Sequence, residues 1–424
     1  MMRKLAFVVL VSAGCLKDVQ HHCTDSTSCT LNGMIGTCEP QGFCSFADPT
    51  CPSGRRFGEL AGSLSKQCVG GGEGSDGGLM PQIDARPDMY VADARECFGS
   101  GAYELCFTNM PPMGTVLLMG TLDTNGGSCM AMPASWAAAG QPDACLIVGQ
   151  TVTVDSAGLT VTGTRPLVIV GANVTISGLL DIASHRGGAV APGGNATQCA
   201  AFPTTPANST IGAGAGAGGS FMTRGGNGGR GESSGVIGGT SAAADTAAPT
   251  ILRGGCPGQL GGTGTNPAGA VGAGGGAIYI AAGKLSMPNT GAINASGAGA
   301  TGGGTYSGGS GAGSGGMIVI YTYQVAMGGG KLVANGGGGA SGGSSSANGV
   351  SGSDPTPTAP TTPAPGGNGG GSSGGDGFAG TTQAQSGAFG QNKSGGGGGG
   401  AGGYIQSNIT LIGISSSPNT TIVP

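Results

Sequence analysis

The chain has 424 residues, of which 97 are glycine, 8% are charged and 4% are aromatic, and its formal net charge is −4. The glycines keep no Gly-X-Y period, which excludes collagen, and no basic stripe is present, which excludes the usual electrostatic surface for nucleic acid. Glycine loses more backbone entropy on ordering than any other residue. We therefore expect little helix, and glycine tracts that fold only where neighbouring segments hold them.

Residues 1–15 predict an export signal. Arg3 and Lys4 form a positive segment, and Leu5–Val11 is an apolar stretch too short to span a bilayer permanently. The small residues directly before Cys15 resemble a bacterial lipobox. That resemblance implies lipidation of Cys15, a membrane held through the lipid anchor as partner, and a place in the outer membrane or at the cell surface. Ordinary cleavage after the small residues, followed by secretion, is the alternative.

Cysteine usage indicates an oxidising compartment. The chain has 13 cysteines, and setting Cys15 aside leaves 12, an even number that suits disulfides. Their pairing stays open. A metal site that uses His21, His22 and Cys23 is the weaker alternative, because no C-x-x-C pair is present in this region. The disulfide candidates are Cys23, Cys29, Cys38, Cys44, Cys51, Cys68, Cys97, Cys106, Cys129, Cys145, Cys199 and Cys256.

Residues 16–69 form a cysteine-rich module too small to bury a sufficient core without disulfides. Within it, GFCSF at Gly42–Phe46, SGRRFGELAG at Ser53–Gly62 and the closing Cys68 stand out. These residues resemble a short module near the N-terminus of many exported, glycine-rich (lipo)proteins of myxobacteria. The resemblance implies a Gram-negative, surface-directed origin, and the module has no known activity.

Residues 70–95 are rich in glycine, proline and acids and predict a disordered linker. The chain is expected to be ordered again over 96–424. Four cysteines from Cys97 to Cys145 are expected to staple an N-terminal cap with Trp136 in its core. Short runs of Val, Ile, Leu and Thr then predict six strands: Leu146–Val148, Thr151–Val154, Leu159–Thr162, Leu167–Val170, Val174–Ser177 and Leu179–Ile182.

The strand pattern recurs as pairs, which predicts a repeat protein. The pairs are Leu167–Ile182, Ala277–Ala295, Met317–Asn335 and Tyr404–Ile414. Alternation places Ile278, Ile280, Ile318 and Ile320 in the core. The predicted fold is all-β: a right-handed parallel β-helix, or solenoid, with long glycine-rich loops. Its excursions at 187–275 and 336–403 contain few apolar residues, so we expect them to be mobile, with Cys199 and Cys256 pinning the first.

No catalytic, cofactor or metal site is predicted. After residue 150 only Asp155 and Asp181 among the acids fall near strands, and His185 is the one histidine beyond His22. The glycine motif at Gly226–Gly231 lacks the strand and helix that nucleotide binding requires. We expect an exported surface protein of structural or adhesive type that is not an enzyme, with surface or matrix polysaccharide as a candidate partner. The alternative is a β-helix that binds or degrades polysaccharide.

Overall fold

The computed structural model describes residues 23, 25–31, 34–39, 42–51, 53–58, 61, 64–69, 96–108, 114–391 and 393–423. The chain divides into two compact units, Met1–Tyr90 and Val91–Pro424. The signal, Cys15, His21, His22 and the linker at 70–95 lie outside the described residues, and what the sequence predicts for them stays a prediction. Within the described part, no helix has the length and apolar character needed to cross a membrane.

The first unit is small and held by disulfides. It has a hairpin, β1 and β2, and a three-stranded antiparallel sheet ordered β3-β4-β5. Its buried apolar residues are few, chiefly cysteines with Phe57 and Ala61. Three disulfides join Cys23 to Cys38, Cys29 to Cys44 and Cys51 to Cys68, and they supply the stability that so small a core lacks. The strands are β1 Thr30–Leu31, β2 Met34–Ile35, β3 Thr37–Cys38, β4 Cys44–Ala47 and β5 Arg55–Phe57, and a 3₁₀ turn, η1, spans Ser26–Ser28.

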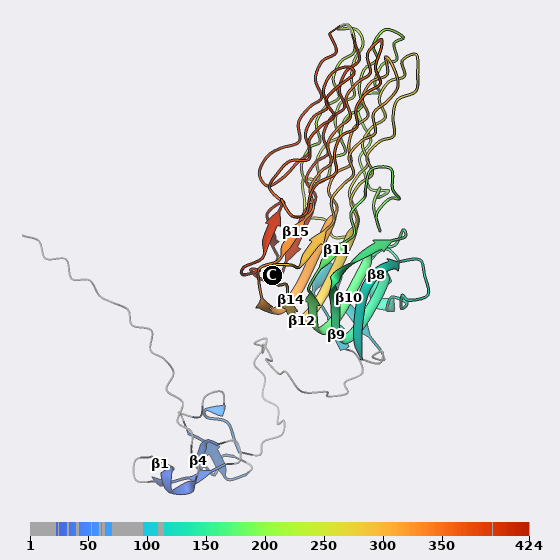
Figure 1. Cartoon of the computed structure of the whole chain (residues 1–424). Coiled ribbons are helices and arrows are strands. Elements are labelled where there is room, and N and C mark those ends of the chain that lie inside the picture. The colour runs from blue at the N-terminus through green and yellow to red at the C-terminus, as the bar shows by residue number, and fades with distance from the viewer. Residues whose placement is uncertain are drawn as a thin grey trace, which may run out of the picture. The chain divides into compact units, whose positions relative to one another are not determined.

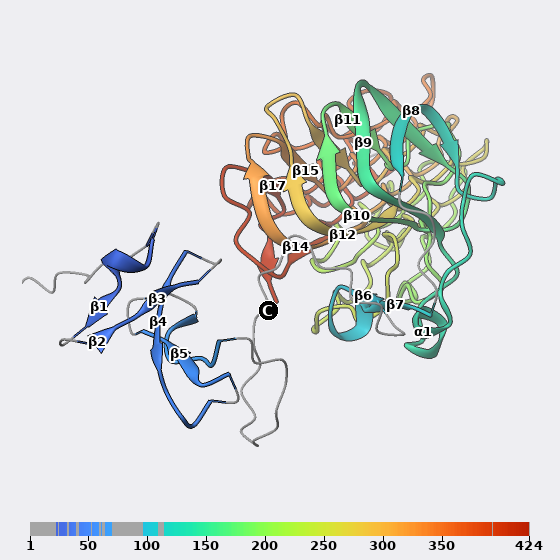
Figure 2. The same ribbon diagram turned by 90° about the horizontal axis from the view of Figure 1, so that it is seen from below.

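The second unit is built on an eleven-stranded parallel sheet that curls into a half-barrel (Figures 1 and 2). Long β9 pairs with β8, β10 and β11, and later strands add alternately on the two sides, in the order β17-β15-β13-β11-β9-β10-β12-β14-β16-β18. These strands are β8 Thr115–Asp123, β9 Cys145–Thr162, β10 Leu167–Ile176, β11 Leu179–Asp181, β12 Ala277–Ser286, β13 Ala292–Asn294, β14 Met317–Met327, β15 Lys331–Val333, β16 Tyr404–Ser407, β17 Ser415–Ser417 and β18 Thr421–Ile422.

The predicted strand pairs stack in one register. Leu167 of β10 lies beside Ile278 of β12, which lies beside Ile318 of β14, and Ile318 lies beside Ile405 of β16. All four side chains are buried in one apolar cluster, as alternation predicts. The last pair differs from expectation, because its second strand is the polar segment Ser415–Ser417, which pairs with β15.

The outer face of the sheet is covered as well. The strands β6 Glu96–Phe98 and β7 Leu105–Phe107, the 3₁₀ turn η3 Gly101–Tyr103 and the helix α1 Ala134–Ala138 lie together on this side (Figure 2). They form a second apolar cluster with the sheet, in which Trp136 is 1% exposed. The sequence predicts a disulfide-stapled cap at the N-terminal end of the solenoid; these elements, which we call the cap, instead cover the outer face of the sheet, and its disulfides join Cys97 to Cys106 and Cys129 to Cys145.

The glycine-rich excursions form a bundle of extended segments that rises from the sheet (Figure 1). Residues 213–219 show its construction. The N–H groups of Ala213, Gly216 and Gly219 donate to carbonyls of the segment 306–312, those of Ala215 and Gly218 donate to the segment 226–229, and residues 214 and 217 accept from the segment 259–262. Every third residue therefore faces the same neighbour. This is the period of the polyproline II helix, which has no internal hydrogen bonds and leaves its backbone groups free for neighbours.

Close packing explains why the bundle is made of glycine. A Cβ placed on Gly216, Gly218 or Gly311 would lie 1.9 Å from a carbonyl oxygen of an adjacent segment. A side chain at these positions would push the extended segments apart and break the hydrogen bonds between them. The expectation of mobile excursions is therefore corrected: they contain almost no large apolar core, yet backbone hydrogen bonds between segments fix them in place.

Candidate functional site

His185 lies between two carboxylates where the sheet meets the bundle. It follows β11, and its Nε2 is 2.9 Å from Asp181 Oδ2 while its Nδ1 is 3.7 Å from Asp354 Oδ2. Asp354 comes from the excursion at 336–403 and also accepts backbone N–H groups of Gly299 and Arg186. The cluster therefore ties the last excursion to an early strand of the sheet.

Electrostatics fix the charge of this cluster. Hydrogen bonds to Asp181 and then Asp354 raise the pKa of His185 to about 10. Burial opposes ionisation of Asp354, but the hydrogen bonds from His185 and the two backbone amides outweigh it and lower the pKa of that carboxyl. At neutral pH His185 is an imidazolium with a carboxylate facing each nitrogen. The cluster thus holds the segment after β11 and the last excursion together, and we call it the clamp.

Asp155, the other acid that the sequence places near a strand, does not join this cluster. Its carboxylate accepts hydrogen bonds from Ala157 and Ser156, both within its own turn. The structure brings Asp181 and His185 together and adds Asp354, which sequence reasoning did not connect with them. No local signal could have done so, since Asp354 precedes the proline-rich stretch of an excursion and meets His185 only through the fold.

A buried polar seam continues from the clamp along successive strands. Asn294 donates to Asp181 at 3.1 Å, and Ser417 Oγ lies 2.6 Å from Asn335 Oδ1. The Asn335 amide in turn donates to the carbonyl of Pro360 in the last excursion at 2.6 Å. The side chains of Asn294, Asn335 and Ser417 are each at most 1% exposed. The seam fixes where each excursion leaves the sheet, and thereby the position of the bundle.

Several excursions turn back together at the far end of the bundle. The amide of Glu232 donates to Gly212, that of Gly390 donates to Arg230, and that of Tyr306 donates to Ser344. From Ser394 in this end to β16 the chain runs ten residues, which corresponds to about 30 Å in polyproline II geometry. Large apolar side chains are exposed in or beside these turns, namely Ile211, Ile237, Val350 and Phe389. We call the turns that contain Gly212, Arg230, Glu232, Tyr306, Ser344 and Gly390, together with these four apolar residues, the distal turns.

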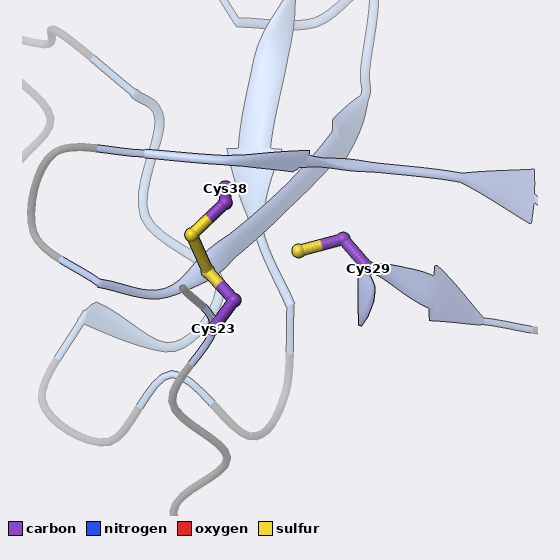
Figure 3. A group of neighbouring side chains, drawn as sticks. All are labelled: Cys23, Cys29 and Cys38. Carbon is purple, nitrogen blue, oxygen red and sulfur yellow. A yellow bond between two sulfur atoms is a disulfide. The ribbon is translucent and has the colours of Figure 1, made fainter. Parts of the chain in front are cut away.

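Among the residues that the structure describes, two groups of side chains have the spacing of metal ligands, but neither offers free thiolates. In the first, Cys23 is bonded to Cys38, as Figure 3 shows, and Cys29, the third residue drawn there, is bonded to Cys44. In the second, Cys97 and Cys106 are bonded to each other beside Glu104. Disulfide sulfurs are not the thiolate ligands that structural zinc requires. Both groups are therefore assigned to disulfides.

The structure pairs all twelve disulfide candidates. The sixth bond joins Cys199 to Cys256 across the first excursion, as the sequence suggested. Six disulfides indicate an oxidising environment outside the cytoplasm. Cys15, the lipidation candidate, lies outside the described residues.

Comparison of the chain with protein-family models, curated proteins and solved structures found no match.

Proposed function

We propose that this protein is an exported surface protein of structural or adhesive type, in which the sheet is the base and the glycine bundle is a rigid stalk. One observation supports the proposal above the others: the excursions are cross-linked by backbone hydrogen bonds in three directions, and their distal turns present exposed apolar side chains. A rigid stalk holds a contact surface away from its base without the entropy cost of ordering a loop on contact.

The distal turns have the composition of a contact surface. They combine exposed Ile211 and Phe389 with serine, threonine and asparagine and with the charged side chains of Arg230, Glu232 and Lys393. Exposed apolar groups rimmed by polar ones are typical of interaction sites. Substitutions in the distal turns disturb the packing less than substitutions in the bundle do. The bundle admits only glycine and other small residues at its crowded positions.

Cells that display the full-length chain test the proposal. Retention of these cells on a surface in a flow cell would be compared with retention of cells that display the variant Ile211→Ser/Phe389→Ser. The matched control is Leu117→Ser on β8, because Leu117 is 53% exposed but lies on the sheet. We expect retention to fall for the distal variant alone. Equal retention of all three chains, at equal display, would remove the adhesive role.

The location and the finer fold belong to the same proposal. We infer that Cys15 is lipidated and that the anchor holds the protein in the outer membrane or at the cell surface. The six disulfides support export alone, since disulfides are typical of proteins outside the cytoplasm. We also infer that the stacked strands form a right-handed β-helix whose third side is replaced by the excursions. The support for this is the common register of the strand pairs on both sides of the curl.

A further inference from the structure

Arg253 lies beside the disulfide that closes the first excursion. Its Nη1 is 3.7 Å from Cys256 Sγ and 3.9 Å from Cys199 Sγ, so the guanidinium donates toward both sulfurs of the bond. In the part of the chain that the structure describes, no other disulfide sulfur accepts from a basic side chain. This disulfide therefore differs from the others in its electrostatic surroundings.

The guanidinium is held in place and shielded from water. Only 7% of the Arg253 side chain is exposed, its Cζ lies 4.1 Å from the centroid of the Phe221 ring, and its Nη2 donates to Asp245. Asp245 offsets part of the charge, but its side chain is 38% exposed, and water weakens the field of an exposed carboxylate more than that of a buried guanidinium. A net positive potential therefore acts on the two sulfurs.

The two sulfurs differ in how easily a molecule from solution reaches them. Cys256 is 5% exposed, and its backbone N–H donates to Ser314 Oγ while its carbonyl accepts from the Ser314 N–H, which fixes it in the bundle. Cys199 is partly exposed, and residues 197–203 make no backbone hydrogen bond to another segment within the described part of the chain. An incoming group therefore meets Cys199 first, and Cys256 is the fixed partner.

These positions suit thiol–disulfide exchange. In that reaction a thiolate attacks one sulfur of the disulfide, and the other sulfur leaves as a thiolate. An arginine beside a cysteine lowers the pKa of its thiol, and a thiol of lower pKa is the better leaving group. Attack on Cys199 would place the new negative charge on Cys256, the sulfur nearer to Arg253.

The more exposed disulfide of the cap has the opposite surroundings. Cys97 is exposed, but the sulfurs of Cys97 and Cys106 and a carboxylate oxygen of Glu104 all lie within 4.8 Å of one another. The carboxylate repels an incoming thiolate and disfavours a departing one. Exposure and charge thus favour different disulfides, so the order in which the two open tells which factor decides.

We propose that the disulfide between Cys199 and Cys256 is a thiol-exchange site whose substrate is a dithiol reductant. One thiolate of the dithiol attacks Cys199 Sγ, the disulfide breaks, and its electron pair stays on Cys256 Sγ beside Arg253. The second thiolate of the dithiol then displaces Cys199. Two electrons and two protons thereby pass from the dithiol, which becomes a disulfide, to the two cysteines. The reaction releases residues 197–203 from the bundle, and it goes beyond the surface role because it does not involve the distal turns.

The test treats the purified full-length chain with a limiting amount of dithiothreitol, a dithiol, at mildly alkaline pH. New thiols are blocked with iodoacetamide at successive times and located by peptide mass mapping. A parallel reaction uses glutathione, a monothiol, which leaves an adduct on the sulfur that it attacks. We expect Cys199 and Cys256 to be the first cysteines blocked, and the glutathione adduct to be found on Cys199.

Two variants isolate the charge of Arg253. Arg253→Lys keeps the charge and Arg253→Gln removes it, while both lose the guanidinium packing. The disulfide should open about tenfold faster in Arg253→Lys, because an adjacent cation lowers the pKa of the leaving thiol by about one unit or more. Arg224→Gln is the matched control and should react as the native chain does, since Arg224 is exposed in the same excursion and bonds only to Ser241.

Three results would overturn the proposal. The first is that another disulfide, such as that between Cys97 and Cys106, opens before the one between Cys199 and Cys256. The second is a glutathione adduct on Cys256. The third is an equal rate of reduction in Arg253→Lys and Arg253→Gln.

Discussion

Replacing Gly218 by alanine should destabilise the second unit because there is no space for a methyl group. Gly218 lies in the interior of the bundle, where its N–H donates to Gly226 O at 2.9 Å. A Cβ at this position would lie 1.9 Å from the carbonyl oxygen of Gly399 and 2.5 Å from its carbonyl carbon. Real Cβ contacts are not closer than 3.0 Å, so the segment around Gly399 would have to move by 1.1 Å, the difference between 3.0 and 1.9 Å.

That movement has a calculable cost. The segment around Gly399 is itself bonded to neighbours on other sides: Gly399 donates to Gln385 at 2.9 Å and Gly397 donates to Ala340 at 2.7 Å. Overpacking a rigid interior costs about 1–3 kcal/mol, and each weakened backbone hydrogen bond adds up to about 1 kcal/mol. We expect a loss of about 3 kcal/mol in the free energy of unfolding, which in a unit of this size lowers Tm by roughly 5 °C.

Gly235→Ala is the matched control. Gly235 lies in an exposed distal turn, and a Cβ there would meet no atom within 4 Å. Alanine at such a position should be neutral or should stabilise the protein by up to about 1 kcal/mol, because it restricts the unfolded chain. Thermal and urea unfolding of both variants, under non-reducing conditions, measures the difference. If Gly218→Ala unfolds like Gly235→Ala, the close-packed bundle is refuted.

Three further predictions concern the clamp, the disulfide across the first excursion and the anchor. Because the pKa of His185 is raised from 6.5 to about 10, its contribution to stability should be complete below pH 6.5 and should disappear as the pH rises toward 10. Urea unfolding at pH 6 and pH 10 should show this loss in the native chain and not in His185→Gln; equal losses would contradict it. Replacing Cys199 and Cys256 together by alanine opens a loop with a sequence separation of 57 residues, which should cost about 4 kcal/mol by chain entropy. Calorimetry checks this, and an unchanged Tm would disprove it. Changing Cys15 to serine should abolish labelling by a fatty-acid analogue and release the protein from the membrane fraction, whereas unchanged labelling would exclude a lipid anchor.

The aliphatic strands of the sheet were predictable because their signal is local, whereas β8 and the polar strands β17 and β18 were not predicted. Alternating aliphatic residues place Ile278 and Ile318 on the inner face, and the recurrence of the pattern places one above the other. The disulfide-held segment around Trp136 was also predictable, since its cysteines and Trp136 cluster before the strands that the sequence predicts from Leu146 onward. The exact pairing of cysteines was not, because it depends on which backbone segments approach one another in space.

The bundle could not be predicted, because order in polyproline II segments has no local signal. Residues 213–219 contain only glycine and alanine, and neither periodic side chains nor internal hydrogen bonds mark them. Their order arises from hydrogen bonds to three segments distant in sequence. For the same reason the sequence did not connect Asp354 with His185, because only the fold brings these two residues together. Likewise Tyr279 and Gln406 are 127 residues apart in the sequence, and only strand register places them in one row, on either side of Val319.

Hydrogen exchange of the native full-length chain tests the central claim, that the glycine-rich excursions are a rigid bundle, most directly. Exchange would be followed by mass spectrometry over the bundle segments 213–219, 307–316 and 395–403, with β12 as the internal reference. If backbone hydrogen bonds hold the segments as described, their amides should be protected to a degree comparable with that of β12. Exchange of these glycine amides at the rate of an unstructured chain, while β12 stays protected, would contradict the account.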